Sequence, residues 1–240
     1  ETISNYKKAK INKSNIWIVT SGGYLLKEAI DNGLYYVKLP KKYPPRTAFG
    51  FMSSILFLIL CKNNIINKSY YYDLKNVYLF LNNYSSNYFK EKNKALDLAK
   101  LLFQKNIIIY STPKTKIIGY RFKSQLAENT KILSYYHYFP EMNHNEIEGF
   151  LNLKYPYEDY FIIWLLDQED DPRILDNIKK MSNVLSFVSN QKQIKFNNEK
   201  LISRQFHMLY FLDVVSFYLA LLYKTDPTPV NNIDKIKKKY

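Results

Sequence analysis

The stretch Ile16–Pro40, IWIVTSGGYLLKEAIDNGLYYVKLP, carries the pattern that decides the fold. Its apolar run IWIVTS predicts a buried strand that ends in a sharp turn at Gly22 and Gly23. YLLKEAIDNG has the pattern of a helix closed by Gly33, and LYYVKLP that of a second strand. Short strand–helix–strand units are typical of a parallel sheet with helices on both faces. The chain is therefore predicted to be an α/β protein.

The same alternation returns further along the chain, beyond a polar segment, CKNNIINKSYYY, that predicts a boundary. An apolar helix from about Thr47 to Leu60 precedes this boundary, and Pro172 suits the first turn of a later helix. The predicted elements after the boundary are the helix KALDLAKLLFQKN, the strand IIIYST, a long helix IIGYRFKSQLAENTKILSYY, the strand DYFIIWLLDQEDD, the helix PRILDNIKKMSNVL, a strand region from SFVSN, a long buried helix ISRQFHMLYFLDVVSFYLALLYKT and a final lysine-rich helix.

The amino-acid composition excludes several classes of site and favours others. The chain has 240 residues, is 47% hydrophobic and carries a net charge of +14. Lysine is spread along the whole chain beside Asn, Ile and Tyr, which favours a composition bias over a nucleic-acid surface. The single cysteine, Cys61, excludes an internal disulfide and a cysteine-based metal cluster and fits a reducing compartment. The apolar run Phe49–Cys61 is expected to be too short to span a membrane.

Polar residues gather in Ser124–Phe150, SQLAENTKILSYYHYFPEMNHNEIEGF. Glu128 lies in a predicted helix, where it is either a general base or a solvated side chain paired with a neighbouring lysine. His144 is either an acid in catalysis or a polar packing group, whereas His137 and His207 are expected to be structural. The HNE sequence lacks the two-histidine helical spacing of a zinc protease, so no metal site is predicted.

Two further segments are candidates for anion recognition. Arg46 follows two prolines that stiffen its loop, and a guanidinium on a stiff loop suits an oxyanion, although a surface arginine is the alternative. The turn TSGG at Thr20–Gly23 lies between a strand and a helix and either brings backbone N–H groups to an anion or is a tight turn without a ligand.

Taken together, VTSGGYLLKEA, VKLPKKYPPRTAFGFMSS, QLAENTK, FPEMNHNEIEGF and the final PVNNIDKIKKKY resemble the bifunctional phosphoglucose/phosphomannose isomerase family, whose members have two sugar-isomerase (SIS) domains. The resemblance runs from residue 1 to residue 240. It implies the flavodoxin-like, three-layer α/β/α SIS fold. It also implies an enzyme without a cofactor that interconverts glucose 6-phosphate, and mannose 6-phosphate, with fructose 6-phosphate through an enediolate.

The resemblance also assigns residues. It makes Glu128 the general base, His144 the proton donor that opens the sugar ring, and Arg46 the residue that binds substrate. The C-terminal lysine of the family best matches Lys237, with Lys235 and Lys238 as neighbouring choices of register. His144 is expected to reach the site of a partner subunit, which implies a homodimer. The predicted partners are thus a hexose 6-phosphate and a second copy, without nucleic acid or membrane.

The resemblance sets the expected domains as well. Residues 1–62 match the C-terminal part of a first SIS domain, and residues 63–240 a complete second SIS domain with C-terminal helices. The family's glycine-serine turn and SGNT-like phosphate loop have no match here, so the chain is expected to be a truncated member. The alternative function is a degenerate SIS module that binds a sugar phosphate or a partner without turnover. A cytoplasmic location and roles in glycolysis and gluconeogenesis are expected.

Overall fold

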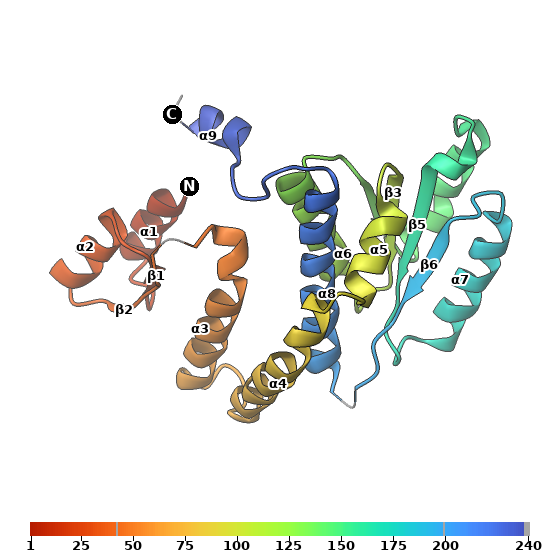
Figure 1. Cartoon of the computed structure of the whole chain (residues 1–240). Coiled ribbons are helices and arrows are strands. Elements are labelled where there is room, and N and C mark those ends of the chain that lie inside the picture. The colour runs from red at the N-terminus through yellow and green to blue at the C-terminus, as the bar shows by residue number, and fades with distance from the viewer. Residues whose placement is uncertain (42, 199, 238–240) are drawn as a thin grey trace. The chain divides into compact units, whose positions relative to one another are not determined.

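The computed structural model describes residues 1–41, 43–198 and 200–237. The chain divides into two compact units, Glu1–Lys75 and Asn76–Tyr240 (Figure 1). The helix α4 (Ser69–Ser85) crosses from the first unit into the second. It was not predicted, and it begins inside the polar segment that was expected to be a boundary.

The first unit is built from two parallel strands, β1 and β2, which pair from Trp17↔Tyr35 to Thr20↔Lys38. The turn between β1 and α2 requires glycine, because Gly22 and Gly23 have φ values of +155° and +74°. The strand, turn, helix and strand of the opening stretch are therefore confirmed. The elements of this unit are α1 (Thr2–Ile11), β1 (Trp17–Thr20), α2 (Tyr24–Asp31), β2 (Tyr35–Lys38), the 3-10 turn η1 (Pro45–Ala48) and α3 (Phe49–Lys62).

The second unit is a four-stranded parallel sheet in the order β4-β3-β5-β6. Because chain order runs from β3 outward in both directions, this is the doubly wound order of flavodoxin-like folds. Its strands are β3 (Asn106–Ser111), β4 (Tyr135–Tyr138), β5 (Tyr160–Leu165) and β6 (Gln191–Ile194), and its helices after α4 are α5 (Lys94–Leu102), α6 (Lys116–Gln125), α7 (Pro172–Val184), α8 (Leu201–Leu222) and α9 (Asn231–Lys237).

Helices cover both faces of this sheet (Figure 1). Ile107 and Ile109 of β3 belong to one hydrophobic cluster, which also includes residues of α5, α6 and α8. Ile108 and Tyr110 point to the other face, where they join a cluster with residues of α7. This alternation along one strand confirms the predicted three-layer α/β/α architecture.

One predicted element is wrong in part. The long helix expected over IIGYRFKSQLAENTKILSYY ends early, and its last residues form the strand β4 instead. The chain leaves the helix at Lys131, whose φ of 61° is left-handed, and β4 then pairs with β3. The predicted helices and strands on either side, from α5 to α9, are confirmed, with β6 a little later than expected.

Two helices are long and apolar enough to cross a membrane, judged by length and composition among the described residues. One is Pro45–Lys62, a helical span of 18 residues that contains the apolar run Phe49–Cys61. The expectation that this run is too short to span a membrane was therefore wrong by length and composition, because the helix begins four residues before the run. The other is α8, where half of the apolar window is buried inside the protein against 6% for Pro45–Lys62. Buried core helices of soluble proteins pass the same test, and α8 lies in the core of the second unit.

Candidate functional site

Glu128 lies on a π-helical turn, η3 (Leu126–Thr130), that continues α6. Its side chain is half-buried, and the turn ends at Lys131. π-turns are rare inside helices and occur frequently at functional sites. The local geometry therefore singles out the same residue as the polar sequence pattern.

A cleft of about 540 Å³ lies beside this turn. Glu128 and Lys131 line one side of it, and Lys235 of α9 lines the other. The remaining lining residues are Ala127, Pro229, Val230, Asn231, Asn232 and Ile233. Clefts of roughly 300–1,000 Å³ are typical of small-molecule sites. A carboxylate, cations and amides thus surround a space large enough for a metabolite.

Lys131 joins the two sides of the cleft. Its Nζ donates a hydrogen bond to the Pro229 carbonyl at 2.8 Å and another to the Glu128 carbonyl. On the C-terminal side, the Asp226 carboxylate accepts a hydrogen bond from the Thr228 backbone N–H at 2.8 Å. This bond lowers the pKa of Asp226, so the carboxylate is charged and the turn before α9 is held at neutral pH.

A polar network on α8 fixes the orientation of the π-turn. Arg121 makes a two-pronged ion pair with Asp213, with contacts of 3.2 and 2.7 Å, and Gln125 donates to the same carboxylate. Asn129, next to Glu128, donates to Ser216 Oγ at 2.8 Å. Burial raises the pKa of Asp213, an effect opposed by Arg121. Because these contacts hold residues on both sides of Glu128, they fix the backbone of the turn that carries it.

His144 lies at the other end of the same sheet. It is the last residue of the 3-10 turn η4 (Glu141–His144), which follows the carboxyl end of β4, and it is exposed. Lys116, at the start of α6, is also at this end, since its Nζ lies 3.6 Å from the centre of the Tyr138 ring. Glu128 is twelve residues further along the helix, which is about 18 Å at 1.5 Å per residue. One chain therefore keeps Glu128 and His144 apart.

The three candidate lysines differ in position. Lys235 lines the cleft beside Glu128, whereas Lys237 is not among the lining residues. Residues two apart on an α-helix point about 200° away from each other, so one face of α9 cannot present both. Lys238 lies outside the described residues. The assignment of Lys237 stays a prediction, and Lys235 is the lysine that the geometry brings to Glu128.

Arg46 belongs to the first unit, in the turn η1 between β2 and α3. It is half-buried, and Thr47 Oγ1 donates to the Pro44 carbonyl at 2.9 Å, which fixes the turn around it. The role of Arg46 stays a prediction. In the TSGG segment, the Thr20 hydroxyl donates to the Gly22 carbonyl at 2.9 Å and accepts from the Gly22 N–H at 3.2 Å, so both backbone polar groups of Gly22 have a partner within the turn.

Comparison with known proteins shows the family to which the chain belongs. Residues 91–240 match the family model described as the bacterial phospho-glucose isomerase C-terminal SIS domain. The whole chain is 33% identical to the bifunctional phosphoglucose/phosphomannose isomerase of Caldicellulosiruptor bescii and covers 72% of that protein. The chain belongs to this isomerase family. Its relative in Aquifex aeolicus, with the same name, is 30% identical over 99% of this chain and 71% of its own length.

Solved structures agree with the fold. A glucose-6-phosphate isomerase-like protein of Thermus thermophilus aligns with a TM-score of 0.62 at 19% identity, covering 90% of this chain and 75% of its own. The tagatose-6-phosphate ketose/aldose isomerase of Escherichia coli aligns with a TM-score of 0.60 at 12% identity, covering 88% and 61%. The chain thus has the SIS fold, and family membership places it among the sugar-phosphate isomerases.

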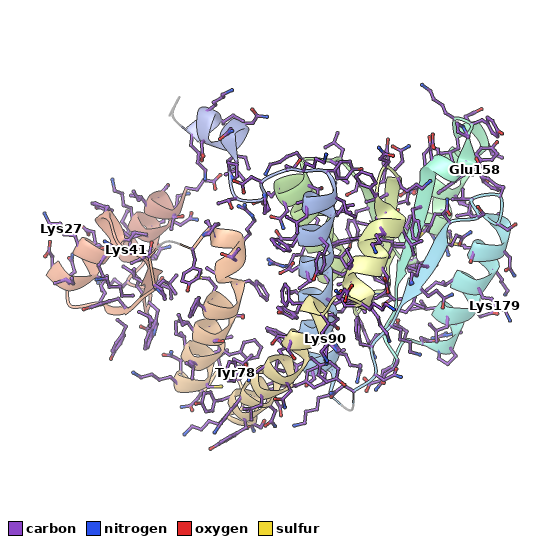
Figure 2. The ribbon with its side chains drawn as sticks, in the orientation of Figure 1. Lys27, Lys41, Tyr78, Lys90, Glu158 and Lys179 are labelled. Atoms are coloured by element: carbon purple, nitrogen blue, oxygen red, sulfur yellow. The ribbon has the colours of Figure 1, made fainter. Side chains whose placement is uncertain are left out.

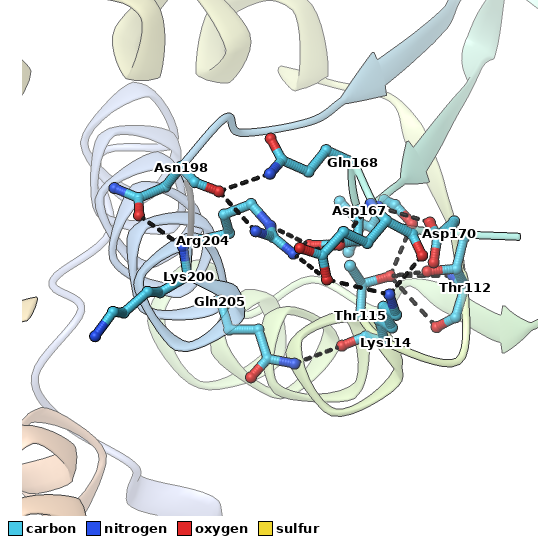
Figure 3. Close-up of polar contacts among 12 residues, drawn as sticks. Thr112, Lys114, Thr115, Asp167, Gln168, Asp170, Asn198, Lys200, Arg204 and Gln205 are labelled. Carbon is cyan, nitrogen blue, oxygen red and sulfur yellow. Dashed lines mark hydrogen bonds and ion pairs between the residues drawn. The ribbon is translucent and has the colours of Figure 1, made fainter. Parts of the chain in front are cut away.

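Doubly wound sheets bind ligands at the carboxyl ends of the strands where the strand order reverses, here between β3 and β5. In this family member that crevice is filled by a buried ion pair (Figure 3). Arg204 donates from Nε and Nη2 to the two oxygens of Asp167, both at 2.9 Å, and from Nη1 to the Asn198 carbonyl at 2.6 Å. Burial is the largest single effect on the Asp167 carboxyl and raises its pKa, but the hydrogen bonds from Arg204 and the Glu169 backbone, with the charges of Arg204 and Lys114, together lower the pKa.

The loop after β3 closes the same crevice. Thr115 Oγ1 accepts from the Thr112 N–H at 3.0 Å and donates to the Leu165 carbonyl at 2.7 Å. Lys114 Nζ lies 3.5 Å from the Glu169 carboxylate, and this carboxylate also lies 2.9 Å from Arg204 Nη2. The groups at this position therefore satisfy one another. Sequence reasoning missed this cluster because Asp167 and Arg204 are 37 residues apart.

The other sequence candidates have local roles. His207 is buried and contacts Tyr88, with 2.5 Å between Nε2 and the phenol oxygen, and burial lowers its pKa to about 4, which confirms a core histidine. Glu146 accepts from the buried Tyr110 hydroxyl at 3.0 Å and so anchors its loop. Cys61 is a buried free thiol. Throughout residues 1–41, 43–198 and 200–237, no group of three or more His, Cys, Asp or Glu is arranged to hold a metal ion.

Proposed function

We propose that the chain interconverts glucose 6-phosphate, and mannose 6-phosphate, with fructose 6-phosphate. The observation that carries this proposal is Glu128, the family's base by resemblance, on a π-turn that lines a metabolite-sized cleft with Lys235. The relatives that are 33% and 30% identical are named for the same two activities. A cytoplasmic location and a place in glycolysis and gluconeogenesis belong to the same proposal.

The proposed chemistry is a proton transfer between neighbouring carbons. The Glu128 carboxylate takes the proton from C2 of the open aldose, the C–H electron pair forms the C1=C2 double bond, and O1 takes the negative charge. Glu128 then returns the proton to C1, the proton on O2 moves to O1, and C2 becomes the carbonyl of the ketose. A cation beside the enediolate oxygens lowers the barrier. Lys235 or Lys237, and Arg46, are the candidate cations in this proposal.

Ring opening requires a second proton donor, and we assign it to His144 of a second copy. One chain holds Glu128 and His144 at opposite ends of its sheet, which supports a site completed by a symmetric partner. The helix α3 also exposes large apolar side chains, with Phe51, Met52, Leu56 and Leu58 between 42% and 54% accessible. Exposed apolar patches of this kind mark interaction surfaces.

The domain assignment is part of the proposal. Residues 1–62 would be the C-terminal part of a first SIS domain and residues 63–240 the second. The parallel β1–β2 pair with α2 supports an α/β origin for the first segment. The match of residues 91–240 to a C-terminal SIS domain supports the second.

The test is a coupled assay in which glucose 6-phosphate formed from fructose 6-phosphate is oxidised by its dehydrogenase. Turnover that depends on Glu128 supports the isomerase. Thermal stabilisation by fructose 6-phosphate without turnover would instead support the alternative, a module that binds without reacting. The observation that favours this alternative is the Arg204–Asp167 ion pair, which fills the crevice between β3 and β5 where doubly wound sheets bind ligands.

Mixing two inactive variants should restore activity. Glu128→Gln and His144→Ala remove the base and the acid respectively, and each dimer alone should be inactive. In a mixed dimer one site receives both wild-type groups, so random exchange of subunits should restore about one quarter of wild-type activity. The measurement is the coupled assay before and after co-refolding. No recovery would mean that His144 serves its own chain or no site at all.

Separate substitutions of Lys235 and Lys237 test which of the two lysines acts in the proposed reaction. Lys235→Ala should reduce kcat/KM by about 10- to 100-fold, because it removes a cation from the cleft that holds Glu128. Lys237→Ala, which makes the same chemical change two residues away, should stay within about twofold of wild type. The reverse order of effects would restore Lys237 as the family lysine. Steady-state kinetics on both variants decides.

A further inference from the structure

A second cleft, distinct from the one beside Glu128, lies wholly within the second unit. Its volume is about 790 Å³, and residues from three separate segments line it. These are the stretch from the end of α4 through the first part of α5, the strand β6 with the residues after it, and the first half of α8. No residue of the Glu128 cleft is among them. The proposed isomerase chemistry leaves this cleft without a role.

Lysine dominates the polar lining. Five of the seventeen lining residues are lysines, namely Lys90, Lys92, Lys94, Lys192 and Lys195, and Asp97 is the carboxylate among them. This share is higher than in the whole chain, where Lys and Arg together are 35 of 240 residues. The general lysine bias of the chain therefore does not account for the share of lysine in the lining of this cleft. Five cations and one carboxylate in the lining of one cleft create a positive potential that attracts a polyanion.

Among the residues that the structure describes, these lysines make few polar contacts with the protein. Lys90, labelled in Figure 2, donates to Asn87 Oδ1 at 2.6 Å, a neutral partner. In the part of the chain that the structure describes, no carboxylate forms an ion pair with Lys92, Lys94, Lys192 or Lys195. The helix α5 begins at Lys94, so its positive end adds to the same potential.

The floor of the cleft is aromatic. The rings of Phe196 and His207 lie 4.1 Å apart between centroids, and Tyr84 lies 5.1 Å from His207. Tyr84 is 43% accessible, so part of its ring is open to a ligand. Flat heterocycles stack on such rings, and cations at the rim of the same site bind their phosphates. A plain inorganic anion would use only the rim.

We propose that this lysine-rich cleft binds a small ligand that carries two or more phosphate groups and a flat ring, of the nucleoside diphosphate class. The phosphates lie against Lys92, Lys94 and Lys195, and the ring lies against Tyr84 and Phe196. The volume of about 790 Å³ lies in the range of metabolite sites, whereas a nucleic acid strand would need a continuous groove. Such a site is separate from the isomerase centre.

The test is isothermal titration of the full chain with ADP and with tripolyphosphate at near-physiological salt. We expect ADP to bind, and the double variant Lys92→Ala/Lys195→Ala to weaken its binding at least about tenfold. Tyr84→Ala should weaken ADP but leave tripolyphosphate unchanged, because only ADP has a ring to stack. The control is Lys27→Ala/Lys179→Ala, which removes two exposed lysines elsewhere (Figure 2) and should bind ADP as wild type does.

Four results would overturn the proposal: no binding of ADP, equal loss in the control, displacement of ADP by fructose 6-phosphate, or tighter binding of a single-stranded oligonucleotide than of ADP. The double variant should keep its isomerase activity without ADP, since its lysines lie outside the Glu128 cleft. Failure of this proposal therefore leaves the proposed isomerase function untouched, and the reverse also holds.

Discussion

Glu128→Gln should reduce isomerase kcat by about 10²- to 10⁴-fold while KM for fructose 6-phosphate changes little, because a general base contributes about that much to the rate. The amide keeps the size and hydrogen-bonding reach of the carboxylate but cannot accept the C2 proton. It therefore removes the proposed chemistry and leaves binding in place. The measurement is the coupled assay, with thermal melting to show that the variant is folded.

Glu158→Gln is the matched control, since it makes the same change at an exposed glutamate (Figure 2). Its kcat should equal that of wild type. A second readout is exchange of the C2 proton of glucose 6-phosphate with deuterium from solvent, which should vanish with Glu128→Gln. If Glu128→Gln retained both turnover and exchange, the assignment of the base would be wrong.

Arg204→Met should destabilise the second unit by about 3–5 kcal/mol, because it leaves the buried Asp167 carboxylate without its partner. Arg204 and Asp167 are 1% and 2% accessible, so water cannot take over the lost hydrogen bonds. The measurement is urea unfolding followed by tryptophan fluorescence, for which Trp164 in the core of this unit is a probe. The midpoint should fall with little change in slope.

Arg173→Met is the control for this prediction. Arg173 makes a similar two-pronged pair with Asp171, at 3.0 and 2.7 Å, but its side chain is 89% exposed. Its loss should shift the unfolding midpoint far less, since exposed ion pairs contribute little. The double variant Asp167→Leu/Arg204→Met should recover part of the loss, because it removes the stranded charge as well. Equal effects of Arg204→Met and Arg173→Met would contradict the argument from burial.

Much of the fold was predictable because most elements have clear starts and stops. The strand β1 is apolar and ends at a glycine pair, and α7 begins with Asp171 as its cap and Pro172 in its first turn. The strand β4 was missed because no Gly or Pro separates it from α6. The helix ends at Lys131 in a left-handed conformation, which sequence patterns associate with Gly or Asn.

The candidate site was predictable by residue type but not by arrangement. The resemblance pointed to Glu128, and the pattern of lysines near the C-terminus left three registers open. Only the placement of α9 brings Lys235 rather than Lys237 to the cleft. The separation of Glu128 from His144 follows from the direction of α6 against β4, and this depends on the strand that sequence reasoning missed.

The π-turn at Leu126–Thr130 has a consequence for how such a site is encoded. On a regular α-helix each residue turns the side-chain direction by about 100°. An inserted or deleted residue upstream of Glu128 would thus turn its carboxylate away from the cleft even if every residue of the ENTK segment stayed the same. The direction of the Glu128 side chain therefore depends on the number of residues in α6 as well as on the residue at position 128. Shortening α6 by one residue is expected to remove the carboxylate from the cleft, as replacing Glu128 does.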